Sequence, residues 1–362
     1  MKFSDVLDIR NGRNQRQVEN ENGKYPIYGS GGIMGRATDF ICDAGTVVIG
    51  RKGSINNPIF VDEPFWNVDT AFGLVAHRDV LLPKYLFYFC VNFDFERLNT
   101  TVTIPSLTKA NLLQIEINVP DMDEQRRVVS ILDKICQLID LQQQELHSLD
   151  QLVKSRFIEL FGDCDLTHPQ ESWVIIKEIG SVVGGATPKT DHNEYWGGSY
   201  RWITPAELDA DSGYIYDSVR KLTKAGVESC SLQEMPVGTV ILSSRAPIGK
   251  VAIAGNTFYC NQGFKNIICK EGITPRYLYT VLLLNVEYLN SLGRGATFKE
   301  ISKGIVESIR IPVPSMELQE QFAAFVEQTD KSKYYSSLSF RYCQAAANTY
   351  RQEWMTCRTS DF

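Results

Sequence analysis

The two halves of this chain repeat each other, and the repeat constrains the fold more than any other feature. Three blocks recur in the same order at offsets of 192 to 194 residues: Gly45–Lys52 with Gly238–Arg245, Pro83–Tyr88 with Pro275–Thr280, and Ile117–Gln125 with Ile311–Gln319. Solenoid repeats have periods of only about 20–50 residues. A period this long predicts one domain-plus-helix unit used twice. Two similar domains suit a target that itself has two parts.

Length and composition are those of a two-domain globular protein. A chain of 362 residues holds two domains at roughly 100–200 residues each. It has no apolar run of about 18 residues and no secretory N-terminus, so we expect neither a membrane span nor export. Nine cysteines without a Cys-x-x-Cys pair argue against a disulfide framework and a zinc site. These features together favour the cytoplasm.

The first half predicts a mixed domain followed by a long helix. Short β-prone runs occur at 47–49, 59–61 and 72–75, and proline opens an aromatic helix at 83–93. A brief helix at 106–113 and a strand at 114–119 complete a domain at 1–120. We therefore expect an α+β fold.

Helical periodicity marks the next segment and its counterpart. Apolar residues follow steps of four and three between 122 and 161, interrupted only by Gln142. We therefore place a central long helix at 121–162, a second mixed domain at 163–314 and a C-terminal long helix at 315–356. The second helix has the weaker stripe, since Thr329, Lys333 and Ser336 replace the counterparts Ile135, Ile139 and Gln142. A long amphipathic helix needs a partner helix, and the chain supplies one.

Catalytic motifs do not emerge from the sequence. Gly29–Gly35 lacks the spacing and the following acidic residue of a dinucleotide loop and is better explained as a turn. Asp121–Glu124 places carboxylates at a helix start, where they complement the helix dipole. The four histidines are too widely spaced for a metal-ligand pair. No active site and no cofactor site is therefore expected in this chain.

Basic and hydroxyl residues, in contrast, recur in both halves. Gly50–Ser54 places two cations on a tight turn after an apolar strand, and Ser243–Lys250 occupies the same place in the second half. Such residues on rigid turns suit contacts to phosphates and base edges. A single residue of this kind is equally well explained as surface charge. Recurrence of the set favours a function although the net charge is −6.

The chain resembles the specificity subunit of type I restriction–modification systems. The resemblance rests on Tyr25–Gly32, Ile49–Gly53 and Glu63–Thr70 in the first half, on Gly184–Lys189, Asn193–Gly198 and Trp202–Leu208 in the second, and on Ser155–Gly162 between them. It covers residues 1 to about 335. The family's C-terminal helix normally continues the coiled-coil pattern, whereas residues 334–362 here are rich in Ser, Ala and Tyr.

This resemblance implies a non-catalytic reader of double-stranded DNA. Two target recognition domains are each expected to recognise half of an asymmetric site. Two long antiparallel, coiled-coil-like helices are expected to relate them by a pseudo-twofold axis. Methyltransferase and restriction subunits are the implied partners, and adenosylmethionine, ATP and Mg are expected on those partners. We predict these DNA-contacting residues: Arg51, Lys52, Thr103, Lys109, Tyr200, Arg201, Arg245, Lys250, Arg294, Thr297, Lys299 and Lys303.

Two other functions stay open at this point. One is a non-catalytic scaffold, or an orphan subunit that dimerises through its helices. The other, disfavoured by the missing motifs, is an autonomous adenine methyltransferase. A neighbouring methyltransferase gene would favour the specificity subunit, whereas adenosylmethionine binding by the isolated chain would favour the enzyme.

Overall fold

A computed structural model describes residues 1–99, 104–208, 213–245, 247–295 and 299–356, with the side chains up to residue 350. The chain forms two compact units, the first built from two segments distant in sequence and the second from one continuous segment. The first unit comprises Met1–Leu146 and Tyr335–Phe362, and the second comprises His147–Tyr334. Each long helix therefore contributes one end to each unit.

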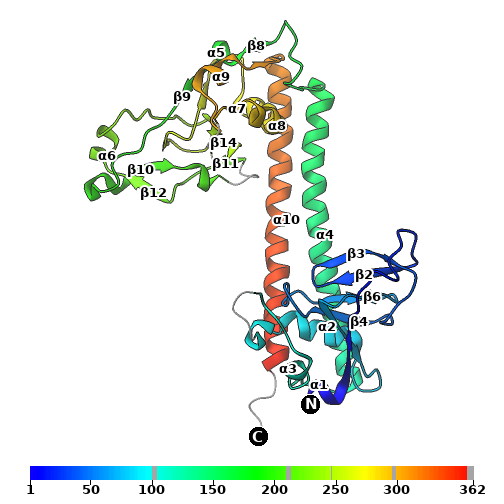
Figure 1. Ribbon diagram of the computed structural model, residues 1–362. Helices are drawn as coiled ribbons and strands as arrows, with labels where there is room; N and C mark the ends of the chain where they lie inside the picture. The colour runs from blue at the N-terminus through cyan, green and yellow to red at the C-terminus, as the bar shows by residue number, and fades with distance from the viewer. Residues whose placement is uncertain (100–103, 209–212, 246, 296–298, 357–362) are drawn as a thin grey trace. The chain divides into compact units, whose positions relative to one another are not determined.

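Two small sheets form the β structure of the first unit (Figure 1). A four-stranded antiparallel sheet has the order β1-β7-β4-β5, and a three-stranded sheet has the order β3-β2-β6. Every residue of the central strand β4 is buried, as its β-branched sequence favours. The strands are β1 (Leu7–Asn11), β2 (Tyr25–Gly29), β3 (Gly32–Ala37), β4 (Thr46–Gly50), β5 (Ile59–Val61), β6 (Trp66–Asn67) and β7 (Ala71–Ala76).

Short helices cover the four-stranded sheet and close the core of the first unit. Proline occupies the first turn of α2, where its missing N–H costs no helical hydrogen bond. Tyr85 and Leu86 of α2 are fully buried, together with Leu132 of the first long helix. The helices are α1 (Phe3–Val6), α2 (Pro83–Asn92), the 3-10 helix η1 (Phe95–Leu98) and α3 (Lys109–Leu112).

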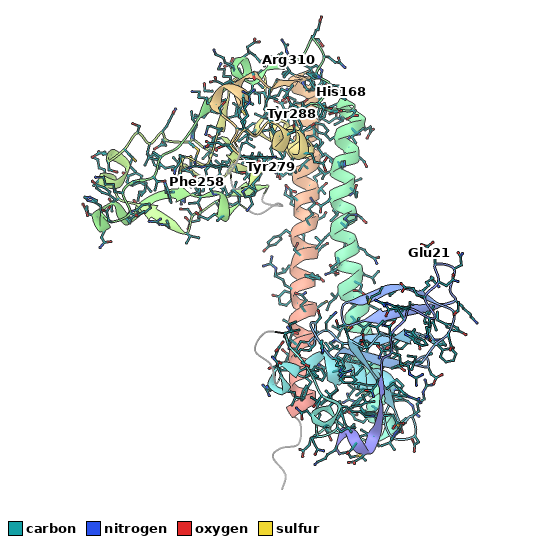
Figure 2. All side chains as sticks on the ribbon, viewed as in Figure 1. Glu21, His168, Phe258, Tyr279, Tyr288 and Arg310 are labelled. Carbon is teal, nitrogen blue, oxygen red and sulfur yellow. The ribbon has the colours of Figure 1, made fainter. Side chains whose placement is uncertain are left out.

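The second unit has a five-stranded sheet of order β11-β14-β13-β16-β9 and a three-stranded sheet of order β12-β10-β15. A pair formed by β8 and β17 adds a further edge, where Arg310 (Figure 2) donates a hydrogen bond of 2.8 Å to the Trp173 carbonyl. The strands are β8 (Val174–Ile175), β9 (Gly180–Val183), β10 (Trp196–Ile203), β11 (Tyr214–Ile215), β12 (Arg220–Leu222), β13 (Val240–Ser244), β14 (Ile248–Ala254), β15 (Tyr259–Cys260), β16 (Asn266–Cys269) and β17 (Arg310–Ile311).

The helices of the second unit follow the order of those in the first. Proline again opens the aromatic helix α7, which buries Tyr277 and Leu278. The helices are α5 (Ile176–Ile179), η2 (Asn193–Tyr195), η3 (Pro205–Glu207), α6 (Lys224–Glu228), α7 (Pro275–Leu284), α8 (Val286–Ser291) and α9 (Lys303–Ser308).

Strand pairing confirms the repeat that the sequence predicts. In the first unit β1 pairs with β7 and β7 with β4, and in the second β9 pairs with β16 and β16 with β13, all antiparallel. In each three-stranded sheet the central strand has one antiparallel and one parallel neighbour. The two domains are thus one α+β fold used twice, with the extra α6 in the second copy.

The long helices are α4 (Met122–Phe161) and α10 (Met316–Thr356). In the second unit, aromatic side chains of the two helices pack together, and the ring centroids of Phe322 and Phe157 are 5.3 Å apart. Lys333 of α10 forms an ion pair with Asp150 of α4. Because Phe157 lies beyond Asp150 along α4 while Phe322 precedes Lys333 along α10, the helices are antiparallel there. The helix α10 includes residues 334–356, whose departure from the heptad pattern does not interrupt it.

A buried glutamine fixes the entry of each long helix. Gln125 accepts a hydrogen bond of 2.8 Å from the Leu82 amide and donates to the carbonyls of Val80 and Pro120, both at 2.9 Å. Gln319 repeats this arrangement with the Thr274 amide and the carbonyls of Gly272 and Pro314. Both glutamines are fully buried. This shared clamp explains why the helix entries are the best-conserved part of the repeat.

One predicted element is wrong. Residues 114–119 form no strand, and only an isolated bridge joins Glu116 to Lys2. Its backbone hydrogen bonds go to the N-terminal residues, where the Phe3 amide donates to the Ile115 carbonyl at 2.9 Å and the Ile117 amide donates to the Met1 carbonyl at 2.8 Å. The pairing stays short because α1 begins at Phe3. Among the described residues, no helix has the length and hydrophobicity needed to cross a membrane.

Candidate nucleic-acid interface

The turn after β4 carries two cations in the first domain. The Arg51 amide donates to the Thr70 carbonyl at 2.8 Å, and the Arg51 carbonyl accepts from the Leu107 amide at 2.9 Å. An isolated bridge joins Lys52 to Ser106. The backbone of this turn is thus held on both sides, while the side chains of Arg51 and Lys52 are exposed. The Arg51 guanidinium lies 5.7 Å from the centroid of the Phe72 ring.

The second domain repeats this turn with different charges. The Ser244 amide donates to the Gly263 carbonyl at 2.8 Å, and its carbonyl accepts from the Ile301 amide at 3.0 Å. The next residue, Arg245, donates to Glu300 at 3.5 Å. Lys265 donates to the same carboxylate at 3.0 Å. The predicted contact Arg245 is therefore placed on the turn, but in an ion-paired cluster.

Three further predicted cations lie in the loop and helix that follow Ser291. Arg294 and Lys299 are exposed, and the backbones of Arg294 and Glu300 exchange hydrogen bonds of 3.1 and 3.0 Å. Lys303 is exposed at the start of α9 and lies 3.7 Å from Glu307. Glu300 thus links Arg294 and Lys299 to Arg245, because its backbone pairs with Arg294, it follows Lys299 in the chain, and its carboxylate binds Arg245.

Two predicted contact residues use their ammonium groups inside the fold. Lys109 donates to the Ile9 carbonyl at 3.0 Å. Lys250 donates to the carbonyls of Pro205 and Leu208, at 3.1 Å for Pro205. A lysine that binds main-chain carbonyls holds loops together, so phosphate contact by either would compete with these bonds.

Tyr200 and Arg201 lie on β10, in the three-stranded sheet of the second unit. Arg201 forms an ion pair of 3.2 Å with Asp217. Tyr200 is 37% exposed, and its ring lies edge-on to Tyr259, with centroids 6.1 Å apart. Burial, followed by its hydrogen bond to Glu234, raises the pKa of Tyr259 to about 12. This ring therefore stays a neutral support for the exposed Tyr200. Thr103 and Thr297 lie outside the described residues.

The sequence reasoning missed one exposed cation beside the first turn. Arg13 follows β1, and its amide donates to the Asn67 carbonyl at 2.8 Å. Its side chain is exposed. The segment from Asn67 to Thr70 thus binds the backbones of both Arg13 and Arg51. Three arginines spaced three residues apart at 10, 13 and 16 were the signal that could have found it.

The glycine-rich motif at Gly29–Gly35 and the acidic motif at Asp121–Glu124 both have structural roles. Gly29 ends β2 and Gly32 begins β3 with a positive φ of 120°, so the glycine-rich segment is a hairpin, as predicted. Asp121 accepts a hydrogen bond of 2.8 Å from the Glu124 amide and caps α4. Within the described part of the chain, no three His, Cys, Asp or Glu residues are grouped to hold a metal ion.

Both halves of the chain match one known protein family. The model of the type I restriction modification DNA specificity domain matches residues 1–151 and again 171–334. This chain belongs to that family. The two matches coincide with the repeat, so each half of this chain is one copy of the family's domain.

Two known specificity subunits align with different shares of this family member. It is 43% identical over 185 residues to the MjaIX specificity subunit of Methanocaldococcus jannaschii, covering 49% of this chain and 43% of that protein. It is 25% identical over 292 residues to the EcoR124I/EcoR124II specificity subunit of Escherichia coli, covering 75% and 69%. The chain spans less than two thirds of MjaIX and of the related MjaX subunit, 63% of which it covers.

Solved structures share the fold along the whole chain. The S subunit of a type I restriction–modification system from M. genitalium has a TM-score of 0.64 at 16% identity, and the match covers 99% of this chain and 96% of that subunit. A second type I system structure gives a TM-score of 0.59 at 15% identity.

Proposed function

We propose that this protein is the DNA sequence-specificity subunit of a type I restriction–modification complex. Each domain reads one half of a bipartite, asymmetric site on double-stranded DNA. The observation that carries this proposal is the duplicated turn after β4 and β13, held by the same backbone bonds in both domains and bearing cations in each. Rigid cationic turns suit the phosphate and base-edge contacts that such a reader needs.

The proposal assigns catalysis to partner subunits. Methyltransferase subunits, which use adenosylmethionine, modify the site, and restriction subunits add ATP- and Mg-dependent translocation and cleavage. This chain holds the DNA and the partners in register. The difference between the domains in loops and charge fits one protein that reads two different half-sites.

Methylome sequencing of the host, with and without this gene, tests the proposal directly. We expect methylation at one split asymmetric motif to disappear when the gene is deleted and to return when it is restored. Methylation that is unchanged by the deletion would contradict the proposal and favour the scaffold function.

The basic turns are tested by the double variant Arg51→Ala, Arg245→Ala. In gel-shift assays with the methyltransferase partner, we expect weaker binding and a shallower dependence of affinity on salt. Each lost phosphate contact reduces the slope of log K against log salt by about 0.9. Arg126→Ala is the control, because Arg126 is an exposed arginine on α4 that pairs with Asp123. An unchanged slope in the double variant would remove these turns from the DNA interface.

A further inference from the structure

Matched backbone hydrogen bonds define equivalent positions in the two domains. The Arg13 amide bonds the Asn67 carbonyl at 2.8 Å, and the Ala186 amide bonds the Cys260 carbonyl at 3.0 Å. Arg13 therefore corresponds to Ala186. Arg13 and Ala186 each lie six residues after the first residue of their strand, Leu7 of β1 or Gly180 of β9, and these strands occupy the same place in their sheets.

The turn residues correspond in the same way. The backbone amides of Arg51 and Ser244 each donate to a carbonyl in the turn before β7 or β16. Their backbone carbonyls accept from the amides of Leu107 and Ile301. It follows that Lys52 corresponds to Arg245. The isolated bridge of Lys52 with Ser106 then makes Ser106 the counterpart of Glu300. Three of these four pairs differ in charge, namely Arg13 with Ala186, Arg51 with Ser244, and Ser106 with Glu300, while Lys52 and Arg245 are both cations.

The edge of the first domain holds unpaired cations. We call Arg13, Arg51 and Lys52 the first edge. All three are exposed, and none forms an ion pair with a carboxylate among the residues the structure describes. Asp69 is an exposed acid in the turn before β7. It forms no ion pair with these three cations in the described part of the chain. The first edge therefore retains a net positive charge.

The equivalent edge of the second domain, which we call the second edge, comprises Ala186, Ser244 and Arg245 and has its cation held by a carboxylate. Ala186 and Ser244 are uncharged, and Arg245 shares the Glu300 carboxylate with Lys265. The Lys265 side chain is only 14% exposed and also donates to the Ser244 hydroxyl at 3.3 Å. Glu300 thus fixes both cations in one hydrogen-bonded cluster.

From this difference we infer that the two domains hold DNA by different means. The first edge, with Arg13 as a contact residue, binds phosphates and contributes more salt-dependent affinity than the second edge. The second edge depends less on salt and contacts DNA through the fixed donors of the Arg245 cluster. This inference rests on the proposed function, since it concerns the same DNA.

Counterion release gives the physical reason. A cation that neutralises a phosphate releases condensed ions, and the gain falls as salt rises. A cation already neutralised by a carboxylate releases fewer, because DNA must compete with Glu300 for Arg245. Serine at position 106 leaves Lys52 without such a competitor.

A reciprocal exchange tests the inference. Ser106→Glu places a carboxylate opposite Lys52, and Glu300→Ser removes the one opposite Arg245. The full-length protein with its methyltransferase partner is titrated with a fluorescently labelled duplex of mixed sequence at several salt concentrations. We expect Ser106→Glu to flatten the salt slope by about one contact, or 0.9, and Glu300→Ser to steepen it by up to the same amount. Arg13→Ala should flatten the salt slope by about 0.9, and it leaves the turn of Arg51 and Lys52 unchanged.

Glu228→Ser is the matched control. Glu228 pairs with Lys224 on α6, so the variant makes the same change of net charge away from the edge. Slopes that change equally in Glu300→Ser and Glu228→Ser, together with an unchanged slope in Arg13→Ala, would overturn the inference while the wild type still binds. A wild type that binds no duplex at any salt would overturn the proposed function and this inference with it.

Discussion

At the scale of single residues, two buried glutamines hold the entries of the long helices. Gln125 and Gln319 each satisfy one amide and two carbonyls that are otherwise buried between a loop and a long helix. Below each clamp a tyrosine donates to the same junction: Tyr85 to Asn118 at 3.0 Å and Tyr277 to Pro312 at 2.9 Å. The repeated block in the sequence is therefore a repeated set of hydrogen bonds.

Truncation of one clamp should destabilise its own unit. Gln319→Ala leaves the Thr274 amide and two carbonyls without partners, and a buried unsatisfied group costs about 1–3 kcal/mol. We expect the free energy of unfolding of the second unit to fall by roughly 2–3 kcal/mol. Urea unfolding followed by hydrogen exchange measures this. Gln321→Ala, two residues along α10 and exposed, is the control and should change the free energy little. Equal losses in both variants would contradict the role of the clamp.

Buried thiols make stability depend on pH in the alkaline range. Burial raises the pKa of Cys42 from 9.0 to about 12, and that of Cys260 likewise to about 12. Because the folded state resists losing these protons, the stability is fully present below pH 9 and is lost as pH rises toward 12. We expect Cys42→Ala to reduce the fall in unfolding free energy over this range, by at most about 1.4 kcal/mol per pH unit. Cys343→Ala, on α10, is the comparison. A fall identical to that of the wild type in both variants would show that the Cys42 thiol does not contribute.

At the scale of elements, the sequence predicted what periodicity and local chemistry determine. The apolar stripe between 122 and 161 predicted α4, and β-branched runs predicted β4, β5 and β7. The stripe underrated α10 because Thr329 and Ser336 are polar. Both are nevertheless buried, and the Thr329 hydroxyl donates to the Phe325 carbonyl of its own helix at 3.0 Å. Small hydroxyl residues can satisfy themselves in this way, which a hydrophobic count does not register.

The positions of the candidate contact residues were predictable only where local sequence controls them, and their contact with DNA stays a prediction. The cations of the two turns were found because an apolar strand precedes each turn. The roles of Lys109 and Lys250 depend on carbonyls distant in sequence, Ile9 and Pro205, which no local pattern reveals. The pairing of Arg245 with Glu300 is equally distant, so the difference between the two edges emerges only from the folded chain.

At the scale of the whole molecule, the first unit is not a continuous piece of chain, whereas the second is. The first unit joins residues 1–146 to the end of α10, where Ala347 is 2% exposed and Tyr350 packs against the core that contains Val128. Tyr350 also lies near enough to Arg127 to raise the pKa of that guanidinium, after the larger effect of Glu124. The segment that departs from the family's helical pattern is thus part of the first domain's own core.

Removal of residues 335–362 should therefore weaken the first unit and spare the second. The deletion removes the buried Ala347 and exposes the apolar surface that Tyr350 covers on the core around Val128, while the core around Phe157 and Phe322 keeps its contacts. Hydrogen exchange read by peptide mass spectrometry should show lost protection within residues 1–146 and unchanged protection within 147–334. Ala347→Asp should reproduce this as a single substitution, because it buries a charge without a partner, whereas Tyr342→Ala, at a residue 68% exposed, should not. Equal loss of protection in both units would mean that the end of α10 supports the whole chain, and no loss in either would place it outside the first domain's core.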